Sequence, residues 1–264
     1  MEKHLYECVK LLQEKYGENR IIFVGCYGSQ NYKLDYEGSD YDFKAIVVPS
    51  FEDIVLGKKL VSTTIELPDG LCDVKSIRAM MGCWKKQNVN FVELLFTKYK
   101  WVNPEYETVL KPLFDYNERI VHYDEQRAIN CIKGMQMEKY HALFKPYPSQ
   151  KEVIDKYGYA AKQLSHIWRL RDLISKYVRG ELYSNCLVPL ESLRKILIEI
   201  KEYKPVLTKE EVIASAKMAM DETNKLLETY SFAPIDEEIG TIMDNVTAGA
   251  IKIALRKELK ELDD

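Results

Sequence analysis

The spacing of hydrophobic residues changes partway along this chain of 264 residues, and that change constrains the fold more than any other feature. Before residue 78, apolar runs at 20–29, 39–48, 61–67 and 70–77 are short and are bounded by glycine or proline, which is typical of strands. From Arg78 onward the spacing becomes three to four residues, which is typical of helices. We therefore expect an α+β protein in which a mixed sheet with flanking helices is followed by an all-α helical bundle.

The change of period also suggests how the chain is divided. We expect two domains, residues 1–120 and 121–264, with the boundary near 117–123. A turn at Pro68-Asp69-Gly70 would join the strands at 61–67 and 70–77 into a hairpin. Helices are expected at 2–15 and over the longer ranges 125–144, 150–178, 190–203, 209–230 and 237–261.

Composition favours a cytoplasmic protein. No stretch approaches the ~20 apolar residues of a membrane span, and the N-terminal segment is a charged amphipathic helix rather than a signal peptide. We therefore expect no membrane partner. The six cysteines are far apart and form no zinc-binding pattern, so we expect reduced thiols.

Charge is unevenly distributed, although the formal net charge is only −3. The segment from Lys133 to Arg179 contains ten basic and four acidic residues, whereas the segment from Glu199 onward contains nine basic and fifteen acidic residues. Aromatic residues are interleaved with the basic segment, and such a combination can bind phosphates and stack bases. The same composition also fits a solvated helix with aromatic core residues.

Two aspartates, Asp40 and Asp42, stand side by side on the expected second strand. Alternate side chains of a strand share a face, so Asp40, Asp42 and Lys44 should project together. Like charges this close are tolerated when a divalent cation lies between them, and hard oxygen ligands suit Mg²⁺ or Mn²⁺. If the strand that carries Asp73 lies beside the second strand, three carboxylates converge, as in the two-metal sites of phosphoryl transfer.

The pair Gly28-Ser29 directly follows the first expected strand and precedes a short segment that could form one or two helical turns. Its backbone N–H groups and the serine hydroxyl could therefore face an anion. Gly28 would let a phosphate approach the backbone closely. Lys44 could offset the acidic residues or contact phosphate, or its tip could simply reach solvent.

The order of these motifs resembles the signature of the DNA polymerase β superfamily of nucleotidyltransferases, in which a Gly-Ser loop precedes an Asp-x-Asp strand and a third acid follows. Residues 27–46 (YGSQNYKLDYEGSDYDFKAI), 72–80 (CDVKSIRAM) and 88–96 (NVNFVELLF) resemble more narrowly the RNA-repair, RNA-ligase-associated branch. Val89 stands where that branch has proline. The resemblance spans about residues 20 to 180.

The resemblance implies a polymerase-β-like, metal-dependent nucleotidyltransferase. Asp40, Asp42 and Asp73 would be the catalytic metal ligands, with Mg²⁺ or Mn²⁺ as cofactor. Gly28 and Ser29 would lie at the incoming nucleoside triphosphate (NTP).

A helical segment similar to the branch's Lys-x-x-x-His-x-x-Arg motif carries Lys162, His166 and Arg169. With Tyr159 these residues form one stripe, which would suit contacts to triphosphate or base; a solvated helix face explains it as well.

We expect an enzyme that moves a nucleoside monophosphate from an NTP, such as ATP, to a hydroxyl acceptor. RNA, either tRNA or a broken RNA end, is the favoured acceptor. One alternative is an antitoxin-type enzyme that adenylylates a partner protein. Another is a non-catalytic module that binds nucleotide or RNA. A Walker-type kinase is disfavoured because the sequence has no Gly-x-x-x-x-Gly-Lys-[Ser/Thr] motif.

Overall fold

A computed structural model describes residues 1–263 of the chain, which divide into two compact units. Neither unit is continuous in sequence, in contrast to the two contiguous domains that we expected. The C-terminal helix, in particular, belongs to the same unit as the N-terminus. The first unit contains residues 1–31, 37–125 and those from Pro234 onward, and the second contains Tyr32–Tyr36 and Gln126–Ala233.

A mixed sheet of five strands forms the centre of the first unit, in the order β3-β4-β2-β1-β5. Strands β2 and β4 are parallel, and every other neighbouring pair is antiparallel. The α+β fold class is thus confirmed. The strand that carries Asp73, β4, lies beside β2, which meets the condition set for the acids to converge. The strands are β1 (Ile21–Cys26), β2 (Phe43–Val47), β3 (Ser62–Leu67), β4 (Gly70–Ser76) and β5 (Lys100–Val102).

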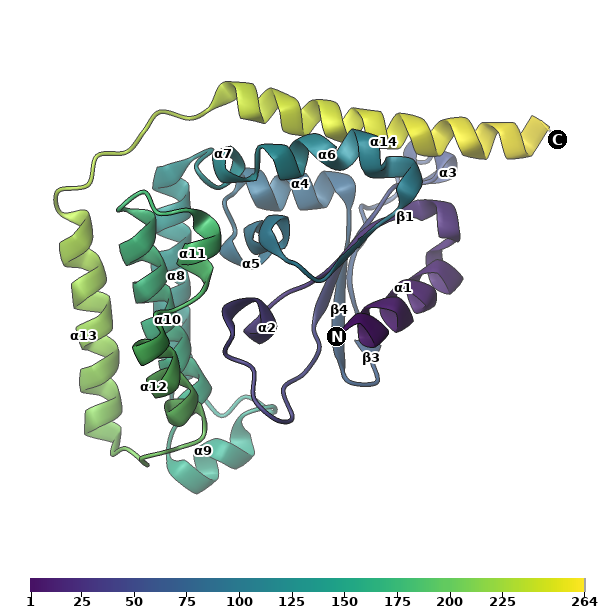
Figure 1. Cartoon of the computed structure of the whole chain (residues 1–264). Coiled ribbons are helices and arrows are strands. Elements are labelled where there is room, and N and C mark those ends of the chain that lie inside the picture. Colours follow the sequence, from purple (N-terminus) through teal and green to yellow (C-terminus); the bar gives the residue numbers. More distant parts are fainter. Residues whose placement is uncertain (264) are drawn as a thin grey trace. The chain divides into compact units, whose positions relative to one another are not determined.

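The two faces of this sheet pack against different helices (Figure 1). On one face, Phe43 and alternate residues of β2 and β4 pack against the apolar side of α1 (Glu2–Tyr16). On the other face, Ile46 lies in a core with Trp84 of α4 (Ile77–Lys85). Because side chains alternate along a strand, Lys44 and its cross-strand neighbour Asp73 lie on this second face.

Helix α14 (Glu237–Asp263) packs along α4 and α6 (Glu107–Asp115) in the first unit (Figure 1). An ion pair of 2.7 Å joins Lys85 to Asp244 of this helix. Lys257 pairs with Glu105 and donates a hydrogen bond to Asn19. These contacts explain why the C-terminal helix groups with the sheet.

The second unit is helical, with a core in which α10 (Ala161–Tyr177) packs against α13 (Lys209–Leu227). The single helix expected over 150–178 is wrong, because α9 (Lys151–Tyr157) ends at Gly158. That glycine has φ of 81°, a left-handed conformation typical of a helix C-terminus. The other helices of this unit are α8 (Glu125–Ala142), α11 (Tyr183–Leu187) and α12 (Glu191–Lys201).

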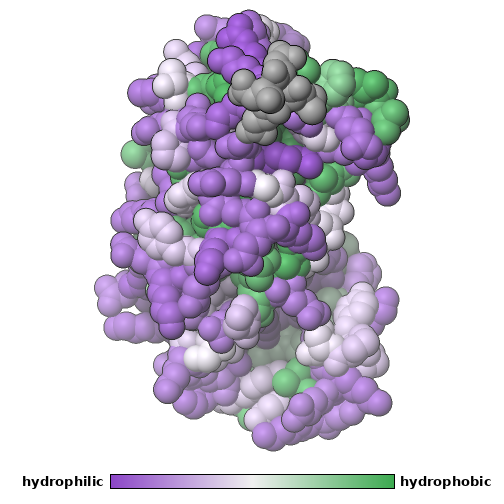
Figure 2. Space-filling model, turned by 90° about the vertical axis from the view of Figure 1, so that its right-hand side faces the viewer, coloured by the Kyte–Doolittle hydropathy of each residue, from purple (hydrophilic) through white to green (hydrophobic). Residues whose placement is uncertain are grey.

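Short helical elements connect the larger ones in the first unit. In the described part of the chain, no helix is sufficiently long and apolar to cross a membrane. The face of the molecule in Figure 2 is mainly hydrophilic, with hydrophobic residues gathered in small areas. The short elements are α2 (Ser29–Tyr32), α3 (Phe51–Val55), α5 (Val89–Val92), α7 (Asn117–Val121), and the 3₁₀ helices η1 (Glu18–Arg20), η2 (Glu93–Phe96) and η3 (Pro104–Tyr106).

Candidate active site

Asp42 lies directly before β2 rather than within it, because the strand begins at Phe43. Its carbonyl oxygen still accepts a hydrogen bond from Tyr27 N–H at 3.0 Å, which extends the pairing of β1 and β2 by one residue. The carboxylate oxygen Oδ1 of Asp42 accepts a hydrogen bond from Leu71 N–H at 3.1 Å. The first carboxylate is therefore fixed at the point where β2 and β4 come together.

Asp73 lies on β4 directly opposite Lys44 of β2. Its carboxylate is 3.6 Å from the ammonium of Lys44 and 3.6 Å from that of Lys75. The strand register places Asp42 and Asp73 on the same face, two residues apart along adjacent parallel strands, or about 8 Å between their Cα atoms. The structure thus brings two of the three predicted acids into one region.

Lys44 is 3% exposed and is held among aromatic rings as well as acids. Its ammonium lies 3.4 Å from the centre of the Tyr27 ring and 4.5 Å from that of Phe91. Burial lowers the pKa of Lys44, while the nearby Asp73 and Glu93 oppose that change. The lysine is therefore a buried partner of the acids, and its tip does not reach solvent.

Tyr27 lies among three carboxylates. Burial raises the pKa of its hydroxyl well above the ordinary value, and the charges of Asp42, Asp73 and Glu93 raise it further, in that order. These carboxylates therefore act on the same phenol. The three carboxylates are therefore close to Tyr27.

Asp40 is not brought into this group. Its side chain is exposed, and Gln30 donates a hydrogen bond to its backbone carbonyl at 3.0 Å. The expectation that Asp40 and Asp42 lie on one strand is wrong, because Tyr41 N–H bonds Asp69 O at 2.7 Å instead of continuing the pairing with β1. The first of the two aspartates thus lies in the connecting loop.

The positions of the acids decide whether this region could hold a metal ion. Among the side chains that the structure describes, no group of three or more His, Cys, Asp or Glu residues is placed to hold a metal ion. Asp42 and Asp73 suit a divalent cation by donor chemistry and by their shared face. Asp73, however, has the two lysine ammonium groups as its partners, and Asp40 is outside the group.

The turn at Gly28 is fixed by a buried carboxylate. Gly28 has φ of +88°, a conformation that side chains other than glycine rarely adopt. Its N–H donates a hydrogen bond at 2.9 Å to Glu93, which is fully buried in η2. The Gly28 N–H is therefore used within the protein.

Ser29 begins the short helix α2, as the sequence predicted for a segment after the first strand. Its hydroxyl donates a hydrogen bond to the side-chain oxygen of Gln30 at 3.1 Å. The side chain of Asn31, in the same turn, donates to Cys26 O at 3.0 Å and thereby ties the helix to the end of β1. The Gly-Ser turn is thus held at the β1 end of the first unit's sheet.

A second group of functional candidates lies in the helical unit, around Arg169 of α10. Arg169 is 3% exposed, yet its Nε and Nη1 atoms have no hydrogen-bond partner. Its guanidinium lies 3.9 Å from the ring centre of Tyr32. A desolvated cation without an anionic partner is costly, so this arrangement indicates a site for an anion.

Further basic groups surround this arginine. Burial lowers the pKa of His166 well below its ordinary value, with Arg169, Lys162 and Lys201 adding to the effect. Burial also lowers the pKa of Lys201 to about 8, helped by Lys162 and Arg169 and opposed by Asp35. The predicted residues Lys162, His166 and Arg169 are thus brought together, although Tyr159 precedes the helix.

The structure adds Lys201 of α12 to this cluster. Its ammonium donates a hydrogen bond to Leu34 O at 2.9 Å. Sequence reasoning did not find this residue, because a lysine near the end of an amphipathic helix gives no signal that it faces another helix. The alternative explanation of these helix residues, a solvated helix face, does not fit Arg169, because Arg169 is buried.

Comparisons with known proteins found a distant structural similarity. No family model matches the chain, and no curated protein matches it. Among solved structures, the chain is similar to a nucleotidyltransferase-like protein from Exiguobacterium sibiricum 255-15, with 13% identity and a TM-score of 0.29. The similarity covers 84% of this chain and 74% of that one. A TM-score of this size does not establish a shared fold, so the function must be argued from the residues.

Proposed function

We propose that the chain is a nucleotidyltransferase that moves a nucleoside monophosphate from an NTP to a hydroxyl acceptor. One observation carries this proposal: Asp42 and Asp73 share a face of adjacent parallel strands, and the Gly28-Ser29 turn follows the neighbouring strand β1. Two acids next to a glycine turn at the end of a strand are the parts that phosphoryl transfer needs. The order of motifs in the sequence supports the same class, EC 2.7.7.

In the proposed reaction the acceptor oxygen attacks the α-phosphorus of the NTP. The bond between that phosphorus and the bridging oxygen of the pyrophosphate breaks, and the pyrophosphate leaves with the bonding electrons. Asp73 takes the proton of the acceptor hydroxyl. Asp42 is held by Leu71 N–H and orients the reacting groups. The Ser29 hydroxyl faces the phosphates.

A divalent ion, Mg²⁺ or Mn²⁺, would be held by Asp42 and Asp73 without Asp40, and it would supply positive charge toward the phosphate oxygens. Lys44 and Lys75 balance the acids, since both lie 3.6 Å from Asp73. Lys44 is therefore proposed to balance the charge of the acids, and to influence the phosphate only indirectly through that charge.

The cluster of Lys162, His166, Arg169 and Lys201 is proposed to bind phosphate groups within the second unit. The unpartnered guanidinium nitrogens of Arg169 support this. RNA is the favoured acceptor, because the basic segment around this cluster also carries aromatic side chains. A place in RNA repair is proposed from the resemblance of the motifs, and transfer to a partner protein is the second choice of acceptor.

A non-catalytic nucleotide-binding module is the second candidate function, and a specific observation favours it. Two lysine ammonium groups lie next to the carboxylate of Asp73, and among the described side chains no three acids are placed to hold a metal ion. Such a module would bind NTP with the cationic cluster and release no pyrophosphate.

Label transfer from α-labelled NTP distinguishes these functions. The whole chain would be incubated with each of the four NTPs, Mg²⁺ or Mn²⁺, and either total RNA or lysate protein. We expect label on RNA, lost in Asp42→Asn and Asp73→Asn and kept in Glu66→Gln, an exposed acid on β3. Label on protein would identify the second acceptor. NTP binding without any transfer would instead support the non-catalytic module.

A further inference from the structure

A cavity of about 480 Å³ opens in the first unit at the opposite end of β2 from Asp42. Pro49 follows the C-terminal end of β2 and lines this cavity, together with Ser76 at the end of the parallel strand β4. At about 3.3 Å per residue, Pro49 lies about 23 Å along the strand from Asp42. The cavity is therefore separate from the candidate active site.

One wall of the cavity is aliphatic and partly open to solvent. Ile54 is 42% exposed and Leu60 is 39% exposed, and both line the cavity with Val61 and Ile251. Exposed aliphatic side chains around a concave space favour a ligand with an apolar body. Volumes of a few hundred Å³ are typical of sites for small organic molecules.

The other part of the lining is cationic. Lys59 lies in the loop between α3 and β3, and Arg78 lies on α4; among the described side chains, neither of these two makes a hydrogen bond or an ion pair. Ser76, which is 1% exposed, adds a hydroxyl whose oxygen accepts a hydrogen bond from Ala79 N–H. An arginine, a lysine and a hydroxyl offer several donors to the oxygens of one phosphate group.

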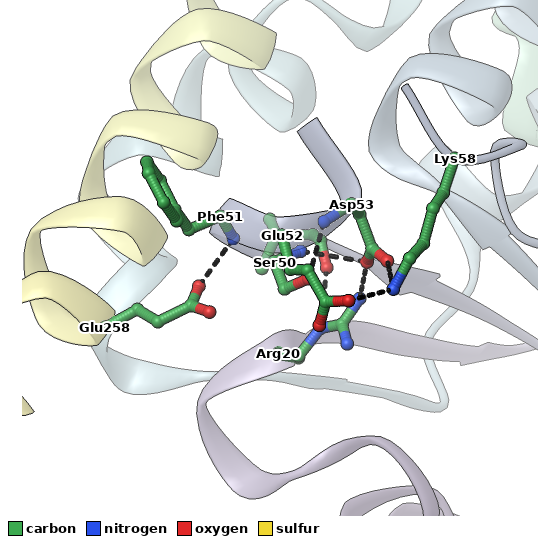
Figure 3. A network of polar contacts seen from close by, with 8 residues as sticks. Arg20, Ser50, Phe51, Glu52, Asp53, Lys58 and Glu258 are labelled. Atoms are coloured by element: carbon green, nitrogen blue, oxygen red, sulfur yellow. Dashed lines mark hydrogen bonds and ion pairs between the residues drawn. The ribbon is translucent and has the colours of Figure 1, made fainter. Parts of the chain in front are cut away.

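The two acids of the lining do not cancel these cations, because each has a partner of its own. Asp53 is 2.6 Å from Arg20, and its carboxylate accepts a hydrogen bond from Ser50 N–H at 3.0 Å (Figure 3). Asp244 is 2.7 Å from Lys85. The positive charge of Lys59 and Arg78 thus remains available to a ligand.

The walls are also held in place. Ser50 caps α3 in a reciprocal box with Asp53. Phe51 N–H donates a hydrogen bond of 2.7 Å to Glu258 of α14, which connects the two helices that flank the cavity (Figure 3). A cavity between elements joined in this way is a formed site rather than a gap between loose segments.

We propose that this cavity binds a small organic phosphate, with the phosphate at Lys59 and Arg78 and an apolar body against the aliphatic wall. The site does not depend on nucleotidyl transfer, since none of its residues belongs to the candidate active site. A ligand there would join α14 and α3 to the C-terminal ends of β2 and β4.

The test is calorimetric titration of the whole chain with 1-naphthyl phosphate as probe. We expect saturable binding of one probe per chain, at least about tenfold tighter than for inorganic phosphate or 1-naphthol. Arg78→Gln removes a cation, and Ala248→Phe fills the cavity and keeps both cations; each should weaken binding about tenfold or more. Lys86→Gln, at an exposed lysine outside the lining, is the matched control and should bind as wild type.

Three results would overturn the proposal. The first is no saturation up to about 1 mM probe. The second is binding that Arg78→Gln and Ala248→Phe both leave unchanged in folded protein, checked by circular dichroism. The third is binding that Asp42→Asn abolishes, which would place the probe at the candidate active site. A chain that transfers no nucleotide but binds the probe at this cavity would still support the proposal.

Discussion

The buried carboxylate of Glu93 should hold the Gly28 turn in place, and its removal should destabilise the first unit. Glu93→Ala leaves the Gly28 N–H without its acceptor at 2.9 Å, and it removes one of the acids that favour the charged form of Lys44. A hydrogen bond to a charged group contributes about 1.5–3 kcal/mol. We therefore expect a loss of about 2 kcal/mol in the free energy of unfolding.

Glu93→Gln separates the two contributions, because the amide keeps an oxygen that can accept from Gly28 and loses only the charge. We expect it to lose about half as much stability as Glu93→Ala. Glu66→Ala, at an exposed glutamate on β3, is the matched control and should stay within about 0.5 kcal/mol of wild type.

Unfolding by guanidinium, followed by circular dichroism and by tryptophan fluorescence, measures these differences. Trp84 reports on the first unit, because its side chain is buried there and its indole N–H donates a hydrogen bond of 2.8 Å to Phe91 O. The reasoning would be refuted if Glu93→Ala unfolded within about 0.5 kcal/mol of wild type, because the contact would then contribute almost nothing to stability.

Three further predictions follow from the same contacts. Gly28→Ala should cost about 1–2 kcal/mol in unfolding experiments, because φ of +88° is strained for alanine while its Cβ meets no atom within 4 Å; an unchanged stability would contradict this. Arg169→Met should raise stability by about 1 kcal/mol without added anion, since it removes a buried unpaired cation, and it should abolish pyrophosphate binding measured by calorimetry. Lys201 has a folded pKa of about 8 against an ordinary 10.5, so the folded state holds fewer protons between these values and its contribution to stability rises with pH there. Lys201→Met should remove that rise from pH-dependent unfolding curves, and identical curves would show that the lysine is not buried.

Much of the first unit could be predicted from hydrophobic period and turn residues. The four apolar runs became β1 to β4, and the Pro68-Asp69-Gly70 turn joins β3 to β4 as expected. Such local signals state which segments are strands, but they do not state where pairing ends. The start of β2 at Phe43 is set by the hydrogen bond from Tyr41 to Asp69, a contact between segments far apart in sequence.

The candidate site shows the same limit. Spacing indicated Asp42 and Asp73, because each lies in or beside a regular element. It left open whether Lys44 pairs with Asp73, since that depends on the register between strands. In the second unit, Gly158 was the one residue in the sequence that could have indicated that the expected helix over 150–178 is divided into two helices. Lys201 left no signal at all.

Manganese binding tests the central claim, that Asp42 and Asp73 form a site for phosphoryl transfer, most directly. Electron paramagnetic resonance of Mn²⁺ titrated with the whole chain and an NTP counts bound ions. We predict that the wild type and Glu66→Gln bind Mn²⁺, and that Asp42→Asn and Asp73→Asn each lose it. Equal binding by all four proteins, or none by the wild type, would contradict the account.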